Sequence, residues 1–211
     1  MVGGIKLWTS PGYCSLAVHI CLREGEFSDV EIVLVSKNED GCLMVGDEPL
    51  SKVNALAQVP AIQIDGGEIM IECPVINMYL QSLVPEKLYF PEGADRWRAL
   101  AVQNFISSDL HQGIVFYFRP YVTPESKQKH LEYNVMKNFN HLNNLLQDGP
   151  FLFGSRPSIV DFYAYVVITW AFIKNIDISS LKNITAFGER IESRPAVRQA
   201  LAEEGISPYF S

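Results

Sequence analysis

The sequence predicts a two-part chain, an α/β domain with a mixed sheet followed by an all-α helical domain. Residues 1–83 alternate between short apolar strands and amphipathic helices in the order βαβ-ββα. The two later strands are joined by only a few residues, which is too short for a parallel crossover, so the sheet is expected to be mixed. From residue 95 to residue 211 the apolar residues recur at helical spacing. Prolines and a glycine mark a linker at 84–94.

Composition places the chain among globular proteins and excludes several functions. Apolar residues make up 48% and charged residues 19%, which suits a packed core. No apolar run approaches the ~20 residues that span a membrane, and no secretory signal is visible, so we expect a cytoplasmic protein. The net charge is −7, and residues 1–83 carry the whole acidic excess. Without a basic face, nucleic acid is not an expected partner.

The cysteines indicate neither a metal site nor a disulfide framework. They lie at positions 14, 21, 42 and 73, without C-x-x-C or zinc-binding spacing. Cys14 and Cys21 would lie roughly 10 Å apart along one helix, beyond the ~7 Å Cα limit of a disulfide. We therefore expect a thiol that is used singly.

Residues 5–24 are the stretch around which the first domain is organised. Ile5 and Leu7 begin a strand, Ser10-Pro11-Gly12 has turn chemistry, and helical spacing starts at Cys14. In the first turn of a helix, unpaired N–H groups and the helix dipole favour a thiolate. We therefore predict a lowered pKa for the Cys14 thiol. The alternative is a small buried apolar residue, as most free cysteines are.

The other elements of the first domain follow from local patterns. Residues 30–35 alternate as a second strand, whereas the polar residues 36–48 are expected to form a loop. After a short helical turn at 49–53, we expect strands at 58–64 and 68–71 around a hairpin turn, and then a helix that opens at 72–74 and runs to 83.

Two places in this domain suit a peptide-like ligand. If the Val59–Pro60 bond is cis, the Val59 N–H and C=O face outward, where an extended ligand could pair with them. The alternative is an ordinary trans proline at a strand start. Glu72 and Cys73 fall at a helix N-terminus, whose amides suit a carboxylate, while Glu72 could take an ammonium group. The alternative is that Glu72 is only a capping acid.

The second domain is expected to be helical throughout, with helices over 94–118, 125–146, 184–192 and 195–204. Ser158-Ile-Val-Asp161 is a capping-box pattern with Asp in place of the usual Glu. The helix that it opens continues through the uncharged run 162–173, which we expect to be buried on all sides.

A polar stripe follows the first of these helices. Asn104, Ser108 and His111 are spaced to share one helical face, between apolar neighbours. Such a stripe is too polar for a core and suits a crevice. The alternative is that His111 is a solvated or satisfied side chain.

Together these segments resemble the cytosolic glutathione transferases. Residues 58–72, joined to a helical half that contains 158–161, are similar to the thioredoxin-like half of that family and its partner domain. Residues 10–17, with His19 and 22–24, resemble the bacterial beta class, in which a cysteine stands where other classes have Tyr or Ser. Further similarity covers 104–111, 118–120, 193–197 and 202–205, so the resemblance spans essentially the whole chain.

The resemblance implies a homodimeric glutathione transferase. Glutathione would be the co-substrate, without a metal, and a small apolar electrophile would enter at the helical domain. Cys14 could form a mixed disulfide with glutathione, so thiol–disulfide exchange is as plausible as conjugation, and peroxidase activity through Cys14 is a further candidate. The alternative is a non-enzymatic interaction or regulatory protein that keeps the fold.

The family also implies roles for particular residues. A cis bond precedes Pro60, Val59 pairs with the cysteinyl part of glutathione, and Glu72 and Cys73 hold its γ-glutamyl end. Cys14, Asn104 and His111 surround the sulfur, with Cys14 and His111 catalytic.

Three departures from the family pattern affect the predicted site. Position 73 is usually Ser or another small donor, and the thiol of Cys73 donates weakly. Gln112 stands where close members often carry Lys, and Lys37 could supply the missing cation to the glycyl carboxylate. Residues 55–57 lack the usual Pro and Gly, and the loop 36–48 is longer than typical.

Overall fold

The computed structural model describes residues 4–210 and divides the chain into two compact units. The first unit comprises the chain up to residue 88 together with 194–208, and the second comprises 89–193 together with the residues from 209 onward. The sequence placed all of 95–211 in one helical domain. The structure instead assigns 194–208 to the first unit, because the last helix packs there on the first helix.

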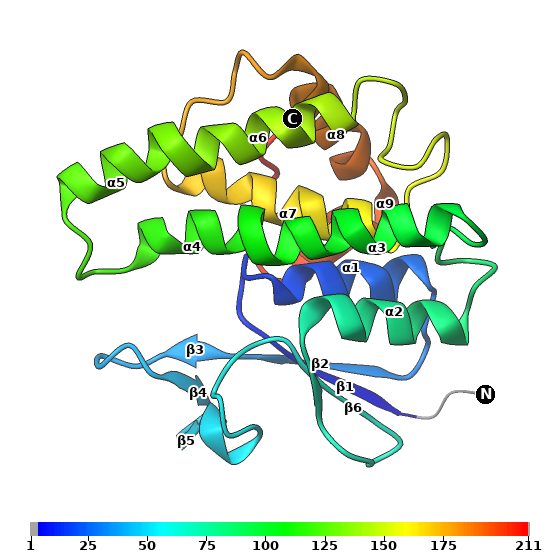
Figure 1. Cartoon of the computed structure of the whole chain (residues 1–211). Coiled ribbons are helices and arrows are strands. Elements are labelled where there is room, and N and C mark those ends of the chain that lie inside the picture. The colour runs from blue at the N-terminus through cyan, green and yellow to red at the C-terminus, as the bar shows by residue number, and fades with distance from the viewer. Residues whose placement is uncertain (1–3, 211) are drawn as a thin grey trace. The chain divides into compact units, whose positions relative to one another are not determined.

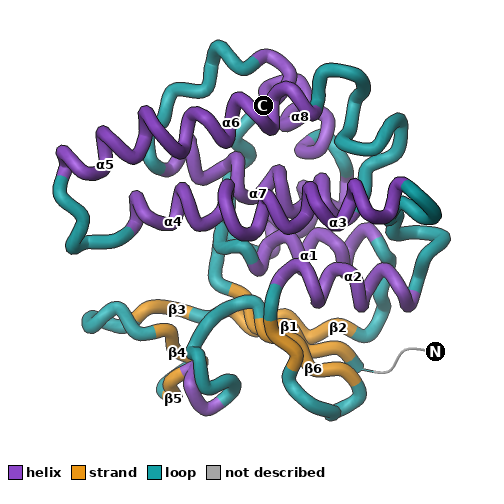
Figure 2. The backbone as a smooth tube through the Cα atoms, in the orientation of Figure 1, coloured by secondary structure: helices purple, strands orange, loops and turns teal. Residues whose placement is uncertain are grey.

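The main sheet of the first unit is mixed, as predicted (Figures 1 and 2). Strand β1 pairs in parallel with β2 and antiparallel with β6, which continues antiparallel into β7. The hairpin turn lies where expected, since the Gly67 N–H donates to the Ile64 C=O at 2.9 Å. The strand bounds are β1 Ile5–Thr9, β2 Val30–Leu34, β6 Ala61–Ile64 and β7 Met70–Ile71, in the spatial order β2-β1-β6-β7.

Among the residues that the structure describes, this unit contains the α-helices α1 Ser15–Glu24, α2 Cys73–Leu83 and α9 Pro195–Glu203. Helices α1 and α2 lie on the same face of the sheet (Figure 1). Residues 15–22 of α1 are all buried, because the helix packs on β1, α2 and α9. Arg194 donates to both carboxylate oxygens of Glu24, with Nη2 at 2.8 Å from Oε2, and so joins the start of α9 to the end of α1.

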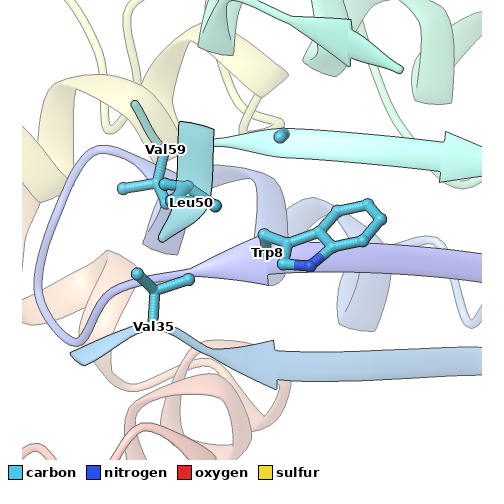
Figure 3. Packing of buried hydrophobic residues seen from close by; sticks show 5 residues of the cluster. Trp8, Val35, Leu50 and Val59 are labelled. Carbon is cyan, nitrogen blue, oxygen red and sulfur yellow. The ribbon is translucent and has the colours of Figure 1, made fainter. Parts of the chain in front are cut away.

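Residues 36–48 differ from the expected loop. They form most of a small antiparallel sheet, with strands β3 Ser36–Lys37, β4 Leu43–Val45 and β5 Glu48–Pro49, followed by a 3₁₀ turn at Leu50–Lys52. Leu43 and Val45 of β4 pack against a buried cluster that includes Trp8, Val35, Leu50 and Val59 (Figure 3). This tertiary contact, and not local polarity, decides the conformation of the segment.

The second unit is helical, and two of its predicted helices contain π-helical turns. The helix expected at 94–118 consists of α3 Asp95–Phe105, a π-helical segment Ile106–His111 and α4 Gln112–Phe118. The helix expected at 125–146 consists of α5 Pro124–His130, a π-helical segment Leu131–Val135 and α6 Met136–Leu145. Such turns occur preferentially at functional sites, and His111 ends the first of them.

The remaining helices are α7 Ile159–Ile173 and α8 Lys182–Glu192. The predicted capping box is confirmed, since the Ser158 N–H donates to Asp161 Oδ2 at 2.7 Å and the Asp161 N–H donates to Ser158 Oγ at 3.4 Å. Residues 159–171 are buried as expected, but Phe172 and Ile173 are exposed, so the helix leaves the core in its last turn. Over residues 4–210, no helix is long and apolar enough to cross a membrane.

Candidate functional site

Cys14 lies at the N-cap position of α1, directly after the predicted turn. The Tyr13 N–H donates to the Ser10 C=O at 3.0 Å, and Gly12 adopts a φ of +74°, which glycine tolerates without strain. The Cys14 Sγ donates to the C=O of Val59 at 3.4 Å. The sequence therefore placed this thiol correctly, at the start of the helix.

The pKa of Cys14 differs from the prediction. Burial raises the pKa of the Cys14 thiol to about 12, because a thiolate here would lose its hydration. Hydrogen bonding from the backbone at Cys14 and Ser15 lowers the pKa by less, and the nearby charge of Glu72 raises it further. The helix start acts in the predicted direction, but desolvation outweighs it.

The Val59–Pro60 peptide bond is cis, as the family resemblance implied, whereas the residues alone had left cis and trans open. Val59 precedes β6, whose pairing with β1 begins at Ala61. Its side chain packs in the buried cluster, and its C=O accepts the Cys14 thiol (Figure 3). The main chain of Val59 is therefore outside the sheet and next to Cys14.

Glu72 and Cys73 form the start of α2. Glu72 is exposed, makes no capping hydrogen bond with its side chain, and has a φ of +75°. Its role as a capping acid is therefore not supported. A positive φ costs a non-glycine residue of order 1–3 kcal/mol and often accompanies function. Cys73 is 3% exposed, and its Sγ donates to the C=O of Cys14 at 3.4 Å.

Lys37 lies in β3 and is exposed. Its Nζ atom is 5.5 Å from the centroid of the Tyr13 ring, the residue before Cys14. A cation is thus held beside the turn that carries the thiol. The first unit therefore brings together Cys14, Val59, Cys73 and, through Tyr13, Lys37.

In the second unit, His111 is half-buried at the end of a π-helical segment. Its Nδ1 is 2.6 Å from the Tyr163 hydroxyl, and its ring packs edge-on against Trp170 with centroids 4.8 Å apart. Burial lowers the pKa of His111 to about 4, so the ring is neutral near pH 7. Asn104 and Gln112 lie on the same helical stretch and are exposed. Their roles toward glutathione stay predictions.

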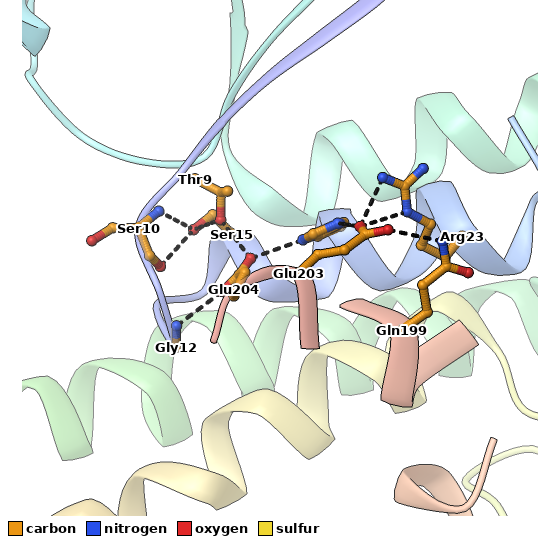
Figure 4. Close-up of polar contacts among 9 residues, drawn as sticks. Thr9, Ser10, Gly12, Ser15, Arg23, Gln199, Glu203 and Glu204 are labelled. Atoms are coloured by element: carbon orange, nitrogen blue, oxygen red, sulfur yellow. Dashed lines mark hydrogen bonds and ion pairs between the residues drawn. The ribbon is translucent and has the colours of Figure 1, made fainter. Parts of the chain in front are cut away.

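A buried acid that the sequence did not reveal holds the turn before Cys14 (Figure 4). The Glu204 carboxylate is fully buried, and it accepts hydrogen bonds from the Thr9 hydroxyl at 2.8 Å and the Gly12 N–H at 3.0 Å. Its Oε1 is also 3.0 Å from Nδ1 of His19. Glu204 and Gly12 are 192 positions apart in the chain, so no local pattern connects them.

The neighbouring acid extends this network along α1. The Glu203 carboxylate lies 2.6 Å from Nε2 of His19 and accepts from Arg23 Nε at 2.8 Å. Gln199 donates to its other oxygen at 2.8 Å. Both ring nitrogens of His19 are therefore engaged, and the end of α9 is fixed to α1. Within residues 4–210, no cluster of His, Cys, Asp and Glu side chains could hold a metal ion.

Comparisons with known proteins agree with this geometry. A family model described as the glutathione S-transferase C-terminal domain matches residues 105–195. Glutathione S-transferase GstA of Escherichia coli O157:H7 is 34% identical over 206 residues, which cover 96% of this chain and 100% of that protein.

Solved structures of high similarity include a glutathione transferase from Methylococcus capsulatus, with 35% identity, a TM-score of 0.86, and coverage of 95% of this chain and 98% of that one. A beta-class glutathione S-transferase of Sphingomonas chungbukensis has 33% identity and a TM-score of 0.85, covering 96% of this chain and 100% of that one. A sphingomonad enzyme complexed with glutathione has 34% identity and a TM-score of 0.84, with the same coverage of 96% and 100%. The chain therefore belongs to the glutathione S-transferase family, in its bacterial beta class.

Proposed function

We propose that this enzyme binds glutathione along its first unit and conjugates it, through its sulfur, to small apolar electrophiles. The observation that carries the proposal is the convergence of the Cys14 thiol, the main chain of Val59 and the N-terminus of α2. These are the three groups that an extended γ-glutamyl tripeptide requires: a place for its sulfur, a partner for its backbone and a site for its charged end.

Binding follows from the main chain of Val59 and the start of α2. An extended peptide can pair with Val59 as an additional antiparallel strand, because the sheet does not use that residue. The first amides of α2 suit the carboxylate of the γ-glutamyl end, and the exposed Glu72 carboxylate suits its ammonium group. Lys37 is our candidate partner for the glycyl carboxylate, since Gln112 carries no charge.

The Cys14–Val59 hydrogen bond links binding to the reactivity of the thiol. The Val59 C=O that accepts the Cys14 S–H is the acceptor that an N–H of a bound peptide would use. Peptide binding therefore competes with the thiol for this oxygen and frees Cys14 to approach the ligand sulfur. Thiol–disulfide exchange at Cys14 is the second activity that we propose, because a single thiol adjacent to the peptide subsite suffices for a mixed disulfide.

The second unit supplies the proposed proton-handling group. A neutral His111 can donate or accept a hydrogen bond without bringing a charge to a thiol or a thiolate. We assign Asn104 a hydrogen-bonding role toward the same sulfur, by analogy with the family. A homodimer in the cytoplasm is the assembly and location that family membership supports.

The test is calorimetric titration with glutathione, together with retention on immobilised glutathione. We expect the native protein to bind and Glu72→Gln to weaken binding about 10-fold or more, since charge-assisted hydrogen bonds contribute about 1.5–3 kcal/mol. Glu68→Gln is the matched control, because Glu68 is also exposed in the nearby hairpin but lies outside the site. No binding by the native protein would favour the non-enzymatic alternative. If Glu72→Gln and Glu68→Gln bound glutathione equally well, Glu72 would not be part of the binding site.

A further inference from the structure

We propose that Cys73 is a resolving thiol, which displaces a glutathionyl group from Cys14 and leaves a Cys14–Cys73 disulfide. The proposal rests on the thiol exchange proposed above for Cys14. It gives this chain a dithiol reaction without a C-x-x-C motif, and it assigns Cys73 a chemical role beyond binding the γ-glutamyl end.

The two cysteines lie at the starts of two packed helices. Cys14 is at the N-cap of α1, and Cys73 is the first residue of α2. The Sγ of Cys73 is 3.4 Å from the carbonyl oxygen of Cys14, so one side chain already touches the main chain of the other residue. A disulfide requires Cα atoms about 4.4–6.8 Å apart, and side chains reorient between rotamers to close it.

The other thiols do not compete for this role. Cys21 lies two turns further along α1, roughly 10 Å from Cys14 along the axis, and is fully buried. Cys42 is exposed in the hairpin between β3 and β4, at the tip of the small sheet, which excludes it from this role. Cys73 is therefore the thiol that can reach a group attached to Cys14.

The surroundings of Cys73 favour a fixed order of events. Burial holds the pKa of the Cys73 thiol well above its usual value, and the charge of a Cys14 thiolate raises it further. Cys14 is partly exposed whereas Cys73 is buried, so an external disulfide reaches Cys14 first. The Asn77 Nδ2 lies 3.8 Å from the Cys73 sulfur and is placed to donate to a thiolate. Cys73 is therefore expected to react second, with the disulfide already formed at Cys14 beside it.

The chemistry balances with glutathione disulfide as the oxidant. The Cys14 thiolate attacks one sulfur of glutathione disulfide, the S–S bond breaks, and one glutathione thiolate leaves. The Cys73 thiolate then attacks the Cys14 sulfur, the bond to the glutathionyl group breaks, and a second glutathione thiolate leaves. The two cysteines lose two electrons and two protons. Glutathione disulfide gains both and becomes two molecules of glutathione.

The experiment exposes the full-length protein to glutathione disulfide, followed by acid quenching, alkylation, intact mass and peptide mapping. A Cys42→Ser background removes the exposed thiol. We expect this parent to yield a Cys14–Cys73 cross-linked peptide and to release two molecules of glutathione per chain. With Cys73→Ser added, the reaction should stop at glutathionylated Cys14 after one release. Serine preserves the size of the side chain and the hydrogen bond to Cys14. Cys21→Ala added to the parent should change neither result.

Three results would overturn the proposal, and they are distinguishable. If the parent accumulates the mixed disulfide as fully as the Cys73→Ser protein, Cys73 does not resolve it. If Cys14→Ser still yields a disulfide at Cys73, the pairing is wrong. If no protein acquires glutathione, the thiol exchange at Cys14 fails and the resolving role fails with it. A conjugation assay on the same preparation then shows whether the transferase function stands.

Discussion

At the scale of single residues, the thiol of Cys14 is governed by two opposing effects. The start of a helix favours a thiolate, whereas burial favours the protonated thiol, and in this structure burial dominates. The S–H also donates a hydrogen bond to a carbonyl oxygen, and a thiolate cannot make that bond. The enzyme therefore keeps a protonated thiol beside the main chain of Val59.

We predict that alkylation of Cys14 in the free protein follows a pH profile whose midpoint lies above the free-cysteine value of ~8.5. A raised pKa means that the thiolate fraction is small at neutral pH and rises tenfold per pH unit. Iodoacetamide labelling in the Cys42→Ser background, with peptide mass analysis, measures it. S-methylglutathione should accelerate labelling if it displaces Cys14 from Val59. A midpoint below 8.5 without ligand would contradict the desolvation argument.

His111 gives a second prediction at this scale. Because burial lowers its pKa to about 4, its ionisation should leave no inflection near pH 6.5 in kcat/KM for conjugation. His111→Gln should reduce kcat/KM by about 100-fold, the lower end of the range for general acid–base groups. His141→Gln, at an exposed position of the same unit, should leave it unchanged. An inflection near 6.5 that disappears in His111→Gln would show that the histidine ionises there.

At the scale of elements, α7 depends on its capping box. Burial raises the pKa of Asp161 to about 6, and hydrogen bonds from Leu152 and Ser158 oppose this only in part. An acid with a higher pKa in the folded state stabilises the fold below its unfolded pKa of ~3.9. That contribution is lost as the pH rises through about 6.

We therefore predict that the stability difference between the native protein and Asp161→Asn shrinks between pH 4 and pH 7, by up to roughly 3 kcal/mol for a shift of about two pH units. Urea unfolding at the two pH values measures it. An asparagine side chain has only one acceptor oxygen in place of the two carboxyl oxygens of Asp161. The variant should therefore be the less stable protein at pH 4. Parallel pH dependence of the two proteins would show that Asp161 keeps an ordinary pKa.

Elements with a strong local pattern were predictable from the sequence, and those set by tertiary contacts were not. The turn before Cys14, the hairpin at 65–67 and the capping box of α7 each carry residues whose backbone chemistry decides the conformation. The strands of the small sheet are two or three residues long, too short for alternation to be visible. The π-helical turns shift the spacing by one residue, which a period of 3.6 does not resolve.

The candidate site likewise contains residues that local patterns could locate and contacts that only the fold reveals. Its thiol, its proline and its helix start could be located from local patterns, and the roles that we propose for them come from the family resemblance. The Cys14–Cys73 contact depends on how α1 and α2 pack, and nothing in either segment encodes it. Glu204 was missed because an acid at the end of an amphipathic helix looks like a solvated charge. Only the fold shows that it is buried.

At the scale of the whole molecule, the chain's last helix completes its first unit. Glu204 accepts hydrogen bonds from the turn before Cys14, and Arg194 pairs with Glu24. We predict that Glu204→Gln destabilises the protein by about 1–3 kcal/mol, since an amide cannot satisfy all the donors that face this carboxylate. Glutathione affinity should fall as well, because the turn that carries the thiol loses its anchor. Urea unfolding and calorimetry measure the two effects.

Glu203→Gln is the graded control for that prediction. Its side chain is 33% exposed, so water can replace part of what the carboxylate provides. We expect a smaller loss of stability and no change in glutathione affinity. If the two variants lost the same stability and the same glutathione affinity, the burial of Glu204 and its hydrogen bonds to the turn would not account for the effect.

The nested order of the two units has a consequence for synthesis on the ribosome. Arg194 and Glu24 are 170 positions apart, and at about 5–20 residues per second that separation takes roughly 10–30 s to translate. Throughout that interval the emerging amino-terminal half lacks the helix that locks it. Until α9 has emerged from the ribosome, the surface of α1 that it covers stays exposed to chaperones and proteases.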